Sequence, residues 1–462
     1  MTRTELKIDM RQTIVLILLF PLLFFHCKSE QEIQPNLVFI LADDLNKEDL
    51  PIYGGTNIST PHINQLASEG MKFDHIFTAS AMCAPTRMQL YTGLHPVRSG
   101  GYPNHSRVKP GVKSIVQHLA PYGYRCGLSG KWHVKPLETF AFDKVEPGLA
   151  KDAYLSYMTQ DDRPFVLFVA SKEPHVKWNK GDATKFDPAT IKVPGYLIDN
   201  PETRLALTKY YAEIEYLDHQ VKEVMEALDE SGKAENTIVM FATEQGAQWP
   251  GCKWTLYDRG VAAGLVVKYP PLVTPGSVSR AMVNYIDVLP TFMDIIGAEI
   301  PGMDGKSFLN VLQQETDEHD DYVYGIHTQK GAIGSPEEGY PIRSVRSKDY
   351  LYIKNLRPEV HYSNAVTDRD GENYWQAWLR DSALSEHNAF LAKRYIKRPA
   401  TELYDIKADP LQLDNLAGKE GLNEVVNELE LQLTQWMEQQ GDEGVKTEDN
   451  APNRVGKIEI TH

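Results

Sequence analysis

This chain of 462 residues contains only 4 cysteines and has fewer basic than acidic residues. A chain of this size with so few cysteines is not held together by a disulfide framework, although Cys126 and Cys252 could form one bridge or stay as two partly buried thiols. Acidic residues outnumber basic ones, 63 to 48, and the net charge of −15 disfavours a general binder of nucleic acid or anionic membranes. Apolar residues make up 42% and charged residues 24%, which is ordinary globular composition and excludes intrinsic disorder.

Apolar runs of membrane-spanning length are also missing. The run Ile14–Phe25 has twelve residues, follows basic residues at positions 3, 7 and 11, and suits the core of an export signal. We therefore predict a signal peptide over residues 1–27. Cys27 loosely resembles the lipidated cysteine of bacterial lipoproteins, although His26 and Phe25 replace the small residues usual there. Two outcomes stay open: an anchor in the membrane only through lipid on Cys27, or a soluble exported protein.

Short continuous apolar runs predict buried parallel strands at residues 37–41, 164–170 and 237–242, with weaker patterns at 124–128 and 264–269. Helical patterns alternate with these runs. One helix is expected to begin at Pro61 with Thr60 as its cap, and another covers residues 205–228. This alternation predicts an α/β fold with a doubly wound, mostly parallel sheet.

The pattern changes after about residue 325. Residues 350–353 look like an antiparallel strand, and a final helix carries one apolar stripe formed by Leu422, Val425, Val426, Leu429, Leu433, Trp436 and Met437. We predict a main domain over residues 33–325, a smaller C-terminal α+β subdomain over 326–441, and a loose polar tail over 442–462.

Polar side chains follow several of the predicted strands directly. In open α/β sheets ligands bind beyond the carboxyl ends of the strands, so these side chains are expected to meet at one edge. They are Asp43 and Asp44, Lys131 and His133, His175, and Glu244 and Gln245. Carboxylate and amide oxygens suit Ca²⁺ or Mg²⁺, and lysine and histidine near such a cation would bind an anion and move protons.

The segment from Ala81 to Gly93 contains the pattern Cys83-x-Pro85-x-Arg87 followed by Thr-Gly. It resembles the signature of the type I, formylglycine-dependent sulfatase family, in which the cysteine is oxidised to formylglycine (3-oxoalanine). Further motifs of that family follow in order along residues 35–415 and include Gly130-Lys131-Trp132-His133, Pro174-His175, Lys253-Trp254-Thr255 and Leu403-Tyr404-Asp405. The resemblance implies an alkaline-phosphatase-like fold, sulfatase activity and a formylglycine-generating maturation enzyme as a partner.

The resemblance also implies a role for each site residue. Asp43, Asp44, Glu244, Gln245 and the modified Cys83 would bind one Ca²⁺ ion. Arg87 would orient the formylglycine hydrate, and Lys131 and Lys253 would contact the sulfate oxygens. His133 would assist sulfate release, and His175 would protonate the leaving oxygen.

Glu244 and Gln245 depart from the family pattern, which has Asp-Asn or Asp-His at these positions. Both side chains are one methylene longer, so a retreat of the backbone is expected to keep their oxygens in place. Ca²⁺ tolerates such variation in geometry better than Mg²⁺ does.

The C-terminal part resembles the sulfamidase-like branch of the family, which implies a sulfated carbohydrate as substrate, of algal ulvan or glycosaminoglycan type. A basic stretch contains Arg343, Arg346, Lys348, Lys354 and Arg357. We hypothesise either a solvated face or a subsite in which Arg343 and His327 contact the substrate.

Two other functions compete with the sulfatase. A phosphatase or phosphodiesterase of the same superfamily would usually carry Ser or Thr in place of Cys83 and hold two metal ions. A non-catalytic, surface-anchored glycan-binding protein would lack the reactive side chains, yet Cys83, Arg87 and the lysines and histidines named above are all present.

Overall fold

The computed structural model describes Met1 and residues 34–332, 334–368, 372 and 374–455. The expected signal peptide and Cys27 lie outside these residues. Among the described residues, no helix combines the length and apolar character that crossing a membrane requires.

The larger sheet of the described chain has nine strands. In spatial order they are β4 (Asp143–Lys144), β3 (Arg125–Gly130), β5 (Phe165–Ala170), β1 (Asn36–Ala42), β6 (Thr237–Thr243), β7 (Ala262–Lys268), β2 (Met71–Phe77) and β8 (Ser277–Ser279), with β9 (Val283–Asn284) also paired to β2. β3, β5, β1 and β6 run parallel at its centre. The predicted mostly parallel α/β sheet is confirmed.

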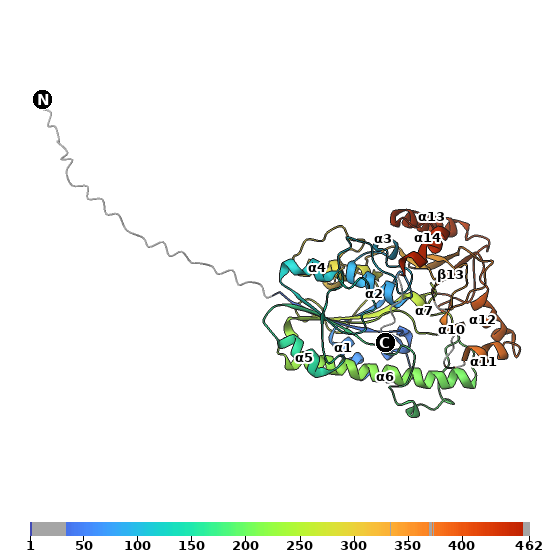
Figure 1. Ribbon diagram of the computed structural model, residues 1–462, viewed down its shortest axis with the longest axis horizontal. Coiled ribbons are helices and arrows are strands. Elements are labelled where there is room, and N and C mark those ends of the chain that lie inside the picture. Colours follow the sequence, from blue (N-terminus) through green and yellow to red (C-terminus); the bar gives the residue numbers. More distant parts are fainter. Residues whose placement is uncertain (2–33, 333, 369–371, 373, 456–462) are drawn as a thin grey trace. The chain divides into compact units, whose positions relative to one another are not determined.

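Helices cover both faces of this sheet (Figure 1). Val38 and Ile40 of β1 pack in one cluster with α6 (Pro201–Glu230), while Leu37 and Phe39 point into the opposite cluster with α2 (Cys83–Thr92). This alternation buries β1 on both sides and explains its continuous apolar sequence. The other helices around the sheet are α1 (Pro61–Glu69), α3 (Pro96–Ser99), α4 (Ile115–Leu119), α5 (Lys151–Thr159), α7 (Asp258–Val261), α8 (Val288–Ile295) and α9 (Leu309–Leu312).

One strand direction and one capping contact differ from the expectation. β7 runs antiparallel to both β6 and β2, so the predicted parallel strand at residues 264–269 is antiparallel. Helix α1 begins at Pro61 with Thr60 in the cap position, as predicted, but the Thr60 hydroxyl donates to the Asn64 side chain and makes no capping hydrogen bond. Asp218 of α6 accepts the free backbone N–H groups of His62 and Ile63 at the start of α1.

The smaller sheet is antiparallel and has the order β10 (Val323–His327), β11 (Ile342–Arg346), β12 (Tyr350–Asn355) and β13 (Thr401–Asp405). The predicted apolar stripe of α13 (Asn423–Gln440) packs on this sheet, with Leu429, Leu433 and Trp436 buried. The remaining helices of this part are α10 (Ala365–Asp368), α11 (Tyr374–Asp381) and α12 (Glu386–Ile396). Because β10 begins at Val323, we propose that the C-terminal subdomain starts there rather than at residue 326.

The expectation of a loose tail after Gly441 is wrong for residues 442–455. This segment contains α14 (Val445–Asn450), and Glu448 within it is fully buried. The Glu448 carboxylate accepts the backbone N–H groups of Gln329, at 3.0 Å, and Lys330, at 2.8 Å. These hydrogen bonds attach the segment to the chain that follows β10.

Candidate active site

Cys83 is the first residue of α2, and the preceding Met82 is extended. Thr86 holds this turn by donating its hydroxyl to the Ser80 carbonyl at 2.9 Å. The Cys83 side chain is 1% exposed, and burial raises the pKa of its thiol although Lys131 and Lys253 lower it. The thiol therefore keeps its proton at neutral pH.

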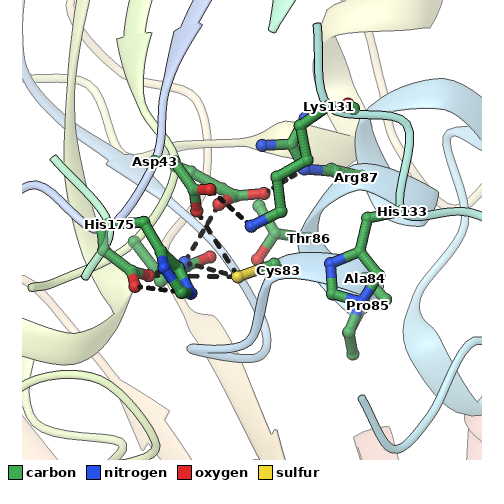
Figure 2. A network of polar contacts seen from close by, with 12 residues as sticks. Asp43, Cys83, Ala84, Pro85, Thr86, Arg87, Lys131, His133 and His175 are labelled. Carbon is green, nitrogen blue, oxygen red and sulfur yellow. Dashed lines mark hydrogen bonds and ion pairs between the residues drawn. The ribbon is translucent and has the colours of Figure 1, made fainter. Parts of the chain in front are cut away.

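Three carboxylates from two neighbouring strands surround the Cys83 sulfur. Asp43 and Asp44 follow β1, and Glu244 follows β6. One ligand atom of each carboxylate and the Cys83 Sγ all lie within 4.8 Å of one another. The sulfur is 3.5 Å from Asp43 Oδ1 and 3.9 Å from Asp44 Oδ1 (Figure 2). The side chains at the ends of the central strands thus meet at one edge of the sheet.

Backbone hydrogen bonds hold the loop after β6 against β1. The Glu244 N–H donates to the Ala42 carbonyl at 3.1 Å, and the Gln245 carbonyl accepts from the Leu45 N–H at 3.1 Å. The Gly246 N–H donates to the Gly260 carbonyl at 3.0 Å. A side chain at position 246 would clash with the Arg259 carbonyl, so glycine is required there. The backbone around Glu244 therefore has little freedom to move.

Each carboxylate has a cationic partner. Arg87 Nε lies 2.6 Å from Glu244 Oε1, with both side chains fully buried. Lys253 Nζ lies 2.5 Å from Asp44 Oδ2, and Lys131 Nζ pairs with Asp43. The three pairs balance the charges in a region where an unpaired charge would be very costly.

Burial and the oppositely charged partner act on each of these pKa values in opposite directions. Burial alone would raise the pKa of Asp43, but Lys131 and His175 hold it well below its ordinary value. Burial raises the pKa of Glu244, and Arg87 opposes this rise. Burial would lower the pKa of Lys253, but Asp44 raises it, so this lysine stays charged.

His175 faces Asp44 from the loop after β5, with Nε2 3.5 Å from Asp44 Oδ2 and the side chain 33% exposed. Its Nδ1 lies 2.5 Å from the Val176 carbonyl, which can only accept, so Nδ1 carries a proton. The Nε2 atom is then the one that can exchange a proton on the site side. Burial lowers the pKa of His175, so it is neutral at pH 7 in this state.

His133 lies on the other side of Cys83, after β3, and its Nε2 is 2.8 Å from His105 Nδ1. Asn104 accepts the Ala84 N–H at 3.1 Å beside the start of α2. Asn104 and His105 thus form part of the site, and sequence reasoning missed them. Their only sequence signal is a short turn after the Cys83 motif, since the contacts come from the fold.

The donor set suits a hard cation. Gln245 Nε2 donates to Asp44 Oδ1 at 2.7 Å and to Glu244 Oε2 at 3.0 Å, while its Oε1 is buried without a hydrogen-bond partner. Rotating the amide by half a turn would present that oxygen to the carboxylates in place of the NH₂ group. Three carboxylates and one amide oxygen are ligands that Ca²⁺ or Mg²⁺ prefers.

The structure does not support the expectation that Arg343 and His327 contact substrate, because both side chains are fully buried. Arg343 pairs with Asp442 and donates to the His327 carbonyl at 3.2 Å. The other cations of the basic stretch also have carboxylate partners: Arg346 with Asp258, Lys348 with Glu318, Lys354 with Glu430 and Arg357 with Asp449.

Comparison with known proteins gives two matching family models. The Sulfatase model matches residues 35–156 and 149–298. The model for the C-terminal part of N-sulphoglucosamine sulphohydrolase matches residues 251–363. An ulvan-active sulfatase from Formosa agariphila is 33% identical over 429 residues, which is 88% of this chain and 81% of that protein.

The chain belongs to the sulfatase family. It is a sulfuric ester hydrolase. The sulfatase is also 27% identical to human N-sulphoglucosamine sulphohydrolase, over 87% of this chain and 89% of that protein. A solved structure of a protein with its substrate D-glucosamine-2-N,6-O-disulfate matches with a TM-score of 0.67 at 19% identity. That match covers 92% of this chain and 100% of the other, and it supports the alkaline-phosphatase-like fold.

Proposed function

We propose that this sulfatase hydrolyses sulfate esters on sulfated saccharides with Cys83, oxidised to formylglycine by a maturation enzyme, as the nucleophile. The observation that carries the proposal is the position of Cys83 at the start of α2, among three carboxylates and beside Lys131 and Lys253. A buried, protonated thiol is a poor nucleophile, so the chemistry of this position favours the modified residue. When present, the hydrated aldehyde supplies one oxygen to attack sulfur and a second to expel sulfate.

The side chains around Cys83 can perform the remaining tasks. Lys131 and Lys253 are placed to neutralise the sulfate oxygens, which needs donors fixed before the reaction begins. His175 Nε2 is the atom placed to exchange a proton with the leaving oxygen, because the Nδ1 proton is held by the Val176 carbonyl. To act as the acid, His175 must first take up a proton at Nε2 and become an imidazolium. His133, held by His105, is placed to take part in sulfate release. Arg87 holds Glu244 and donates to the Lys131 carbonyl at 2.8 Å.

We propose that one Ca²⁺ ion binds Asp43, Asp44, Glu244, Gln245 and the residue at position 83. The buried carboxylates and the free Gln245 oxygen support this set. The ion would add positive charge next to the sulfate group. The departure from Asp-Asn to Glu-Gln keeps the chemical class of both ligands.

The substrate class and location rest on the relatives. Relatives of this chain act on ulvan or on N-sulphoglucosamine, as their names state, so we propose a sulfated polysaccharide or oligosaccharide. The apolar run Ile14–Phe25 supports export to the periplasm or cell surface. We keep a lipid anchor at Cys27 as part of this proposal.

Peptide mass spectrometry of the segment around Cys83 tests the nucleophile. We expect the mass difference between cysteine and formylglycine after co-expression with a maturation enzyme, together with sulfate release from sulfated saccharides. Protein expressed without that enzyme is the control and should be folded and inactive. Full activity with unmodified cysteine would refute the proposal.

A further inference from the structure

Near the C-terminal subdomain, two buried arginines, Arg259 and Arg398, and the partly exposed Arg394 lack an acidic ion-pair partner among the described residues. Arg259 is 5% exposed, Arg398 is 3% exposed, and Arg394 is mostly covered. Within the described part of the chain, none of the three forms an ion pair with a carboxylate. Arg87 and Arg343, by contrast, pair with Glu244 and Asp442.

The carboxylate of Glu402 lies in this region but is already used by other donors. It accepts the hydroxyl groups of Tyr257 at 2.7 Å and Tyr404 at 2.6 Å, and the Asn355 amide at 2.7 Å. One buried carboxylate with these partners cannot neutralise three guanidinium groups. The region therefore carries an excess of positive charge in a position where burial makes such an excess unfavourable.

The guanidinium faces are covered, while several of their N–H groups are free. Arg259 stacks on Tyr196 at 4.4 Å, and Arg398 stacks on Tyr362 at 4.1 Å. Nε and Nη2 of both arginines are buried without a hydrogen-bond partner. Stacking stabilises the face of a guanidinium group but does not satisfy the donors at its edge.

A small cavity lies beside Arg259, whereas Arg398 does not line it. Its lining includes Tyr196, Pro250, Gly251, Tyr257, Arg259 and Arg394. Its volume of about 10 Å³ accommodates one small occupant, such as a water molecule or a monatomic ion. We call this space the Arg259 cavity.

We propose that the Arg259 cavity binds a single monovalent halide, chloride in ordinary solution. Chloride fits the size of the cavity, accepts N–H donors from several directions and neutralises part of the excess charge. A water molecule would fill the same space without supplying the missing negative charge.

The cavity borders the loop that carries Lys253. Pro250 and Gly251 line it, and Lys253 follows two residues later, with its N–H bonded to the Ala247 carbonyl at 3.0 Å. A bound anion next to Pro250 and Gly251 would stabilise the position of this loop and so help to position the Lys253 ammonium group. The anion site itself does not depend on the proposed function, because it contains no residue of the candidate active site.

Bromide soaking tests the site directly, since bromide replaces chloride and is located by its anomalous diffraction. Crystals of the native protein should show a bromide peak in contact with Arg259 and Arg394. A parallel assay follows the melting temperature while chloride replaces gluconate at constant ionic strength. For a chain of this size, an anion at about 100 times its Kd should raise the melting temperature by about 3 °C.

Arg259→Gln should lose this chloride-dependent shift. Arg280→Gln is the matched control, because the Arg280 side chain is 82% exposed and has Asp74 as its carboxylate partner. This variant should keep the full chloride-dependent shift. Absence of a bromide peak in native crystals, or an equal melting temperature in chloride and gluconate, would overturn the proposal. Both measurements on the native protein remain decisive if Arg259→Gln does not fold.

Discussion

Shortening Glu244 by one methylene is the sharpest perturbation of the candidate metal site. In the structure Glu244 Oε1 lies 2.6 Å from Arg87 Nε, and both side chains are fully buried. Glu244→Asp withdraws the carboxylate by about 1.5 Å, one carbon–carbon bond length. The backbone cannot follow, because Glu244, Gln245 and Gly246 are each hydrogen-bonded to neighbouring strands or loops. The pair would open to about 4 Å, the outer limit of an ion-pair contact.

The size of the effect follows from the burial of the pair. Breaking a buried ion pair costs about 3–5 kcal/mol, and we take this as an upper limit because the aspartate keeps its charge. With about 420 residues in the described part of the chain, the entropy of unfolding is about 0.9 kcal/mol/K, so the melting temperature should fall by up to about 3–6 °C. Ca²⁺ affinity should fall at least about tenfold, since even partners behind the metal ligands have effects of that size.

Calorimetric Ca²⁺ titration and thermal unfolding measure both quantities on the purified protein. Added Ca²⁺ should partly restore the activity of Glu244→Asp. The double variant Glu244→Asp, Gln245→Asn restores the residue types usual in the family. It should stay impaired, because the backbone position of the loop decides how far these side chains extend toward the metal. Gln245→Asn alone is the control that leaves the Arg87 pair intact. Unchanged stability, Ca²⁺ affinity and turnover in Glu244→Asp would refute the reasoning.

Four further outcomes are expected. Cys83→Ala should abolish sulfate release with the fold retained by circular dichroism, and ordinary turnover would contradict the nucleophile assignment. His175→Ala should slow hydrolysis of alkyl sulfates by about 10²–10⁴-fold and of aryl sulfates much less, whereas equal losses would remove His175 from the acid role. His105→Ala should lower kcat by about 10- to 100-fold by releasing His133, at unchanged melting temperature, and an unaltered kcat would count against it. Burial raises the pKa of Asp49 to about 7, so this carboxyl loses its proton at lower pH in the unfolded chain than in the folded protein. The free energy of unfolding should therefore fall as pH rises from about 4 to 7, by at most about 1.4 kcal/mol per pH unit. Asp49→Asn should flatten this slope in denaturant titrations.

The central strands, the long helix α6 and the stripe of α13 could be predicted from sequence alone. Their signals are local: a strand buried on both faces must be apolar throughout, and a helix covering a sheet must be apolar at helical spacing. The residues at the strand ends could be predicted to meet for a similar reason, since parallel strands deliver their carboxyl ends to one edge. Asp43, Lys131, His175 and Glu244 could therefore be named before any contact was known.

Contacts between distant segments needed the tertiary structure. Arg343 looked like a substrate-binding cation, but Asp442, 99 residues later in the chain, buries and neutralises it. The Asp218 side chain, rather than that of Thr60, accepts the free N–H groups at the start of α1, and His105 joins the site through a contact with His133. The identity of such partners depends on which surfaces the fold brings together, and no local pattern of charge or apolar residues encodes that choice. The apolar pattern thus determined the sheet and the edge where the site lies, while three-dimensional packing decided which polar side chains contact one another at that edge.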